Sequence, residues 1–259
     1  MKPKIFVRYP QGAAGQFISS LIFSLVTPIT QQNKNGAGHE HDQLISLWHN
    51  FVPQYHNNEF NEMSTEYVNL KDSIKYFQEN YRFEDEKSPY PLFVVNTHVI
   101  NPDPLILAFE NSKLINIQVQ DSERDQLAYN WVIKYLLPLG WPESAYLTLK
   151  VFCEHYPEKL LDSTILEKEN LKLLTYLHRF TQEKKIKRRN DYNLGNGYDY
   201  LEIQFQEILN KNLINRIDEI ADYIGITLTD ERKQNAITLI NEYADAQTVC
   251  PWTLSINDF

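Results

Sequence analysis

The sequence has few cysteines, no excess of positive charge and no long uninterrupted hydrophobic run. Its 259 residues include two cysteines, Cys153 and Cys250, and neither belongs to a CxxC pair. Two isolated thiols indicate neither a disulfide framework nor a zinc site. We therefore expect a protein of a reducing compartment that needs no metal.

The balance of charge and hydropathy argues against two further classes of partner. The formal net charge is −9, and affinity for nucleic acid depends on clustered Lys and Arg, so a nucleic-acid partner is not expected. The basic N-terminus and the apolar run 17–29 superficially resemble a signal peptide, but Pro10, Gly12 and Gly15 separate the two parts. No later stretch reaches the length of a membrane span. These features predict a cytoplasmic protein without a membrane partner.

The order of the hydrophobic segments predicts one α/β domain over residues 1–259. Short apolar runs at 4–8, 92–95 and 114–119, with a fourth candidate at 200–205, are typical of buried parallel strands. Helical patterns at 16–25, before residue 76, at 104–111 and at 124–137 alternate with them. This alternation indicates βαβ units, and hence a three-layer fold with a mostly parallel sheet flanked by helices.

The remaining segments carry weaker patterns. Residues 30–90 are rich in Asn, Gln, His and aromatic residues and are interpreted as an insertion or lid. The stretch 143–183 has a helical pattern, 190–199 is rich in turn-forming residues, and a helical ending is expected over 212–246.

Polar or glycine-rich residues follow each of the first three predicted strands. They are residues 9–16, then Asn96-Thr97-His98, then Gln120-Asp121-Ser122. Ligands of open parallel sheets bind beyond the carboxyl ends of the strands, so we expect these three segments to form one site.

The first of these segments has the composition of an anion-binding loop. Its small residues let the backbone turn NH groups toward a phosphate or sulfate at a helix N-terminus, where the helix dipole adds to the attraction. The loop lacks the Gly-Lys-Ser/Thr ending that Mg-dependent ATP hydrolysis requires. The alternative is a tight turn whose glycines serve packing alone. The candidate anion-binding residues are Gln11, Gly12, Ala13, Ala14, Gly15, Gln16 and Phe17.

Two further residues are candidates because they follow strands. His98 comes directly after a buried strand, and an imidazole that titrates near neutrality suits a general base. The alternative is a histidine that satisfies a backbone group at a strand end. Asp121 caps the helix that begins near Arg124 or contacts a ribose. The His39-Glu40-His41 segment lacks supporting ligands, so it is not expected to bind a metal.

In this order, the features resemble the family of sulfotransferases that use 3′-phosphoadenosine 5′-phosphosulfate (PAPS). Residues 4–17, with Tyr9-Pro10-Gln11-Gly12, are similar to that family's first strand and Tyr-Pro-Lys-Ser-Gly-Thr-Thr-Trp loop, which holds the 5′-phosphosulfate. Thr97-His98-Val99, Pro104 and the run LINIQVQD at 114–121 resemble its Lys-Thr-His-Leu-Pro stretch and the strand before its 3′-phosphate segment. The segments 201–209 and 224–225 are similar to its late strand and following helix.

The resemblance implies an enzyme that transfers a sulfuryl group from PAPS to a hydroxyl or amine of a small-molecule or peptide acceptor. His98 takes the place of the catalytic base, and the product is adenosine 3′,5′-bisphosphate. Residues 11–17 with Asp121 and Arg124 would bind the cofactor, and no metal is expected.

Several residues depart from the family pattern. The loop lysine is replaced by Gln11, the Arg and Ser of the 3′-phosphate segment fall on Gln120 and Ala128, and the C-terminal Arg-Lys-Gly loop is absent. Compensating charge is expected from Arg8, Arg124, Lys134 or the basic run 184–189, which is interpreted as a closing loop or as a solvated helix end. The departures leave two alternatives, a kinase-like phosphoryl transferase and a non-catalytic binding protein that kept the fold.

Overall fold

The computed structural model describes residues 3–10, 12–26, 70–80, 92–98, 101–136, 171–195 and 197–255. The strands are β1 (Lys4–Arg8), β2 (Phe93–Thr97), β3 (Ser112–Gln118) and β4 (Tyr200–Gln204). The helices are α1 (Gly15–Val26), α3 (Leu70–Asn80), α4 (Asp103–Ala108), α5 (Arg124–Trp131), α8 (Leu171–Asp191), α9 (Phe205–Leu209), α10 (Ile217–Ile224) and α11 (Asp230–Asp245). Two 3₁₀ turns, Asp121–Glu123 and Asn212–Arg216, and a π-helical turn, Val132–Leu136, complete the described elements.

The described strands form one parallel sheet in the order β2-β1-β3-β4. Arg8, at the end of β1, lies opposite Thr97 of β2 and Asn116 of β3. The predicted α/β class is therefore confirmed, and the predicted strands correspond to β1–β4 with shifts of a few residues at their ends.

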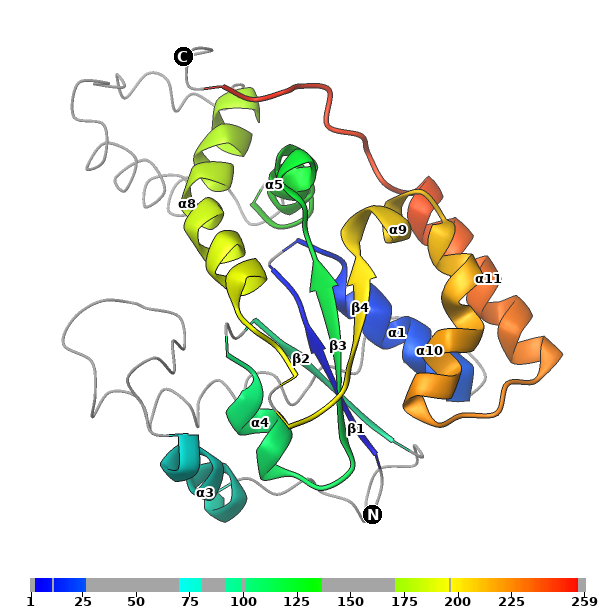
Figure 1. The fold of residues 1–259 in the computed structure, drawn as a ribbon. Coiled ribbons are helices and arrows are strands. Elements are labelled where there is room, and N and C mark those ends of the chain that lie inside the picture. Colours follow the sequence, from blue (N-terminus) through cyan, green and yellow to red (C-terminus); the bar gives the residue numbers. More distant parts are fainter. Residues whose placement is uncertain are drawn as a thin grey trace.

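Helices cover both faces of the sheet (Figure 1). Successive side chains of a strand point to opposite faces, so Ile5 and Val7 pack with α1, α10 and α11, whereas Phe6 packs with α3 and α4. β1 and β2 are buried along their whole length and appear in the sequence as hydrophobic runs, whereas β4 alternates buried Leu201 and Ile203 with more exposed residues.

The carboxyl ends of β1, β2 and β3 lie side by side at one edge of the sheet. α1 follows β1 and packs on one face, whereas the chain after β3 continues into α5, which packs against α8 beyond the carboxyl ends of the strands (Figure 1). Open α/β sheets bind ligands in this region, beyond the carboxyl ends of their strands.

The helical parts of the chain differ from the sequence-based expectation in two places. The helix expected over 124–137 is α-helical only to Trp131 and continues as a π-helical turn. The basic run 184–189 belongs to α8, so it forms the end of a helix rather than a closing loop, and Ile186 and Arg189 within it are buried rather than solvated. Within the described ranges, no helix has the length and apolar character needed to cross a membrane. Two predicted segments lie outside the described residues. They are the lid expected at 30–90, of which the structure describes only α3, and the part of the predicted helical stretch at 143–170. His39 and His41 lie outside them as well.

Candidate active site

The ends of β1 and β2 and the helix α5, which follows β3, meet at one edge of the sheet. The Tyr9 amide donates to the Thr97 carbonyl at 3.1 Å, which joins the end of β1 to the end of β2. On the other side, a Cβ added to Gly12 would lie 3.0 Å from the Leu127 carbonyl of α5. The glycine loop thus lies between the segment that carries His98 and the helix that begins at Arg124.

The sign of φ alternates along the backbone of the loop. The angle φ is positive at Gly12 (86°) and Ala14 (61°) but not at Ala13 between them. Alternating signs of φ also occur in the concave backbone nests that bind anions. Ala14 adopts a conformation that a residue with a side chain rarely takes, so the surrounding packing must stabilise it.

The first turn of α1 supplies amides that the helix itself leaves unpaired. Within the described residues, the amides of Gly15, Gln16 and Phe17 have no backbone acceptor, whereas the Ala13 amide donates to the Pro10 carbonyl at 3.0 Å. The Gln16 side chain is exposed. The Phe17 ring is buried and stacks on the Tyr243 ring with 4.0 Å between the ring centroids, so Phe17 offers only its amide to a ligand. Gln11 lies outside the described residues.

Gly15 is required because an aromatic ring occupies the space of its missing side chain. A Cβ at this position would lie 2.0–2.2 Å from ring atoms of Tyr9, far inside van der Waals contact. The Tyr9 ring is buried and meets the His98 imidazole edge to face at 4.4 Å between centroids. The start of α1, the Tyr9 ring and the imidazole are therefore in contact one after the other.

His98 is held by both its ring and its main chain. Its Nδ1 lies 2.8 Å from the Tyr9 carbonyl oxygen, and because that oxygen only accepts, Nδ1 carries the proton. The lone pair of the neutral ring is then on Nε2, which is the arrangement a general base needs. The main-chain carbonyl of His98 accepts a hydrogen bond from the Arg189 guanidinium of α8.

Arg124 and Asp121, the predicted cofactor-binding residues after β3, bind each other. The Arg124 guanidinium is largely buried and donates to the Asp121 carboxylate and, at 2.7 Å, to Glu183 of α8. Asp121 itself is exposed. An anion that binds Arg124 would therefore have to displace a carboxylate from it.

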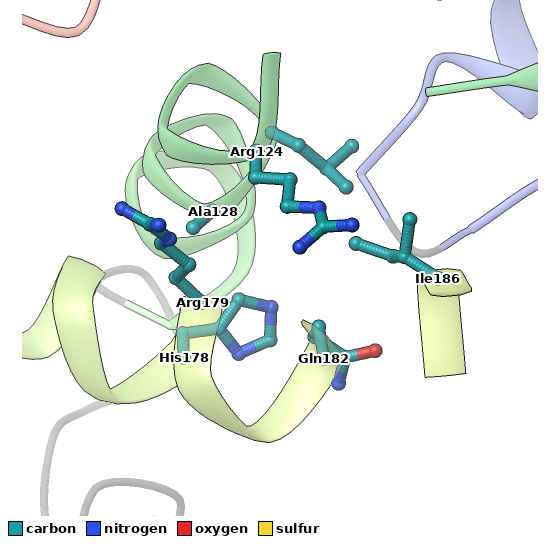
Figure 2. A pocket seen from close by; sticks show the side chains of 7 residues that line it. Arg124, Ala128, His178, Arg179, Gln182 and Ile186 are labelled. Carbon is teal, nitrogen blue, oxygen red and sulfur yellow. The ribbon is translucent and has the colours of Figure 1, made fainter. Parts of the chain in front are cut away.

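A narrow crevice between α5 and α8 lies beside this ion pair (Figure 2). The Arg124 guanidinium extends into it toward Gln182 and Ile186, whereas Arg179 turns away and pairs with Asp125 at 2.6 Å. Arg124 Nε and His178 Nε2 are buried in it without a hydrogen-bond partner among the described residues. The crevice is lined by Arg124, Leu127, Ala128, His178, Arg179, Gln182 and Ile186.

Two other basic residues from which compensating charge is expected, Arg8 and Lys134, make hydrogen bonds to other groups of the protein. Arg8 is fully buried, donates to Asn116 Oδ1 at 2.7 Å and to the Arg189 carbonyl at 2.9 Å, and burial lowers its pKa to about 9. Lys134 donates to Gln247 at 2.7 Å, and burial lowers its pKa as well. Neither side chain is directed by these contacts to a ligand at the glycine loop.

Two residues of the site escaped the sequence analysis. Arg189 was grouped with an exposed basic run, and Glu183 was not singled out. Ile186 and Arg189 are both buried and stand three residues apart on α8, so helical periodicity extended through the run would have placed Arg189 on the inner face. Around the site and elsewhere in the described ranges, no three His, Cys, Asp or Glu residues gather to hold a metal ion.

Replacing Gly15 with Ala should destabilise the protein by about 1–3 kcal/mol, the usual cost of forcing extra atoms into a packed core. The added methyl group forces the Tyr9 ring to move, and the imidazole that meets this ring edge to face moves with it. Urea denaturation would measure the loss, with the exposed neighbouring change Gln16→Ala as the matched control. Equal stability of the two variants would contradict the packing argument.

His178 should make the stability of the fold depend on pH. Burial, with a smaller contribution from Lys185, lowers its pKa from 6.5 to about 3. Between these values the unfolded chain binds a proton that the folded chain excludes, so stability falls as pH decreases through this range. From about pH 7 to about pH 5 the loss from this one group is about 2 kcal/mol.

The variant His178→Phe keeps a ring beside Trp131, which stacks on His178 at 5.6 Å, and removes the titrating group. Its free energy of unfolding, measured with urea at both pH values, should change less with pH than that of the wild type. Parallel pH profiles for the two proteins would show that His178 is not the cause.

Comparison with known proteins finds similarity at the level of structure. No model of a known protein family matches the chain. No curated protein matches it either. Among solved structures, the chain is similar to the sulfotransferase from Alicyclobacillus acidocaldarius, with 11% identity, coverage of 95% of this chain and 96% of that one, and a TM-score of 0.34.

Proposed function

We propose that this protein transfers a sulfuryl group from PAPS to a hydroxyl or amine of a small-molecule or peptide acceptor. The observation that carries the proposal is the position of His98. Its Nδ1–H donates a hydrogen bond to the carbonyl of Tyr9, the first residue of the glycine loop. A base with its lone pair on Nε2 is thereby fixed to the loop that has the geometry for binding an anion. This combination suits transfer of a group from an anionic donor.

In the proposed reaction, His98 Nε2 takes the proton of the acceptor as the acceptor oxygen or nitrogen attacks sulfur. The bond between sulfur and the bridging oxygen of the 5′-phosphate breaks, and its electron pair stays on that oxygen. The products are the sulfated acceptor and adenosine 3′,5′-bisphosphate. Amides of Gly12, Ala14, Gly15, Gln16 and Phe17 face the charge that develops on the leaving phosphate, and the dipole of α1 adds to its stabilisation.

The 3′-phosphate is proposed to bind on the Arg124 side of the loop. Gln120 and Ala128 stand where the resembling family has Arg and Ser, and Arg124 lies one helical turn beyond Gln120 with its guanidinium in the crevice. Its Nε has no hydrogen-bond partner among the described residues. A phosphate that displaced Glu183 would keep Nη1 of the guanidinium paired. Asp121 would remain with Arg124 or contact the ribose.

One observation favours a second candidate, a non-catalytic binding protein. Arg124 is already neutralised by two carboxylates, and Arg8 is bonded to groups of the protein itself. If these pairs are permanent, the chain keeps the fold without the charge needed to hold PAPS. A kinase-like transferase is less favoured, because the loop lacks the lysine of nucleoside-triphosphate sites.

Adenosine 3′,5′-bisphosphate should raise the melting temperature, because a ligand that binds only the folded state stabilises it by about 2.7 kcal/mol at 100 times its Kd. Thermal shift would compare it with adenosine 5′-monophosphate, which lacks the 3′-phosphate, and with ATP plus Mg²⁺. A shift with ATP plus Mg²⁺ alone would support the kinase-like alternative, and no shift with any of the three would support the binding protein.

Replacing His98 with Ala should reduce sulfuryl transfer by roughly 10²- to 10⁴-fold, the usual contribution of a positioned general base. The melting-temperature shift with the bisphosphate should persist, since the cradle is made of loop amides. Transfer would be followed with radiolabelled PAPS and a panel of hydroxyl and amine acceptors. Wild-type turnover in the variant would exclude His98 as the base.

A further inference from the structure

We infer that Arg189 is a positioning residue that fixes the direction of the His98 imidazole. Its effect on catalysis rests on the proposed function, whereas its effect on the ring can be measured without any reaction. Arg189 lies near the end of α8, is 3% exposed, and donates from Nη2 to the main-chain carbonyl of His98.

This hydrogen bond acts on the main chain of His98, whereas the contacts with Tyr9 act on its ring. The Tyr9 carbonyl holds Nδ1, and the Tyr9 ring packs against the imidazole. These contacts fix the ring relative to β1, but the main chain of His98 also has to stay in place for Nε2 to keep its direction. A guanidinium bonded to the carbonyl of the same residue supplies this second restraint.

Arg189 is itself anchored to the centre of the sheet. Its own carbonyl accepts a hydrogen bond from Arg8 Nη2 at 2.9 Å, and Arg8 Nη1 donates to Asn116 of β3 at 2.7 Å. Hydrogen bonds that involve a charged donor are shorter and stronger than neutral ones, particularly away from water. The end of α8 is thus bound to the ends of β1, β2 and β3 together.

The surroundings of Arg8 include a carboxylate that favours its positive charge in the interior. Asp103, 3% exposed, accepts from the hydroxyls of Tyr192 at 2.8 Å and Tyr198 at 2.6 Å, and its charge partly offsets the lowering of the Arg8 pKa by burial and by Arg189. Burying two guanidinium groups costs free energy that an apolar residue would avoid. The arrangement is therefore better explained by the precise hydrogen bonds it makes than by packing.

The experiment compares Arg189→Gln with Arg188→Gln, which removes the same charge from the adjacent, exposed position of the same helix. Nitrogen NMR of the His98 ring reports which nitrogen carries the proton. We expect the wild type and Arg188→Gln to show one tautomer, protonated at Nδ1, and Arg189→Gln to show a mixture. In transfer assays, kcat of Arg189→Gln should fall by roughly 10- to 100-fold, the range expected from a misplacement of about 1 Å, with KM for PAPS unchanged.

Arg189→Lys is the second variant, which also serves if Arg189→Gln does not fold. An ammonium keeps the charge but lacks the planar fork of guanidinium, so we expect partial recovery of the single tautomer and of kcat. A wild-type spectrum and wild-type kcat in every folded Arg189 variant would overturn the inference. If the wild-type protein transfers no sulfuryl group, the proposed function fails, and the NMR comparison alone then decides the role of Arg189.

Discussion

The arrangement of the site depends on the hydrogen bond from His98 Nδ1 to the Tyr9 carbonyl. It joins the exits of two neighbouring parallel strands, and it fixes which nitrogen of the imidazole holds the lone pair. The Tyr9 ring adds a second constraint, because it fills the space that only a glycine at position 15 can leave. The glycine at the start of α1 and the orientation of the His98 ring therefore depend on each other, because both contact the Tyr9 ring.

The electrostatics of the site follow from the same compactness. The chain is acidic overall, and its inner cations near the sheet edge are all held by internal acceptors: Arg8 by Asn116, Arg189 by His98, and Arg124 by Asp121 and Glu183. Within the part of the chain that the structure describes, the groups left for the proposed anion are backbone amides and the Arg124 guanidinium, which would have to change partners. Such a site favours selectivity over raw attraction, since a ligand has to replace each internal contact with one of equal quality.

The sequence was sufficient to predict the class of fold because the pattern that encodes it is repeated. Short apolar runs, the first two of them buried along their whole length, and the polar residues after them indicated a parallel sheet and the edge at which its exits meet. That topology placed His98 and the glycine loop at neighbouring strand ends, which the hydrogen bond from Tyr9 to Thr97 joins. The roles assigned to these residues in PAPS binding and proton transfer stay predictions.

Pairings between distant segments could not be predicted in this way. Glu183 lies 59 residues from Arg124 and Arg189 lies 91 residues from His98, and no local pattern records which acceptor a guanidinium will meet. The basic run illustrates the limit. Its charge density suggested solvent, yet one of its arginines turns inward because α8 continues through it and brings position 189 to the buried face.

The unbroken course of α8 has a consequence for how the two halves of the site respond to each other. Glu183 and Arg189 are six residues apart, or about 9 Å along the helix axis, and one contacts Arg124 while the other contacts the His98 carbonyl. If the proposed phosphate displaces Glu183, the helix carries that displacement toward Arg189. Any coupling between phosphate binding and the orientation of the imidazole would act equally in both directions.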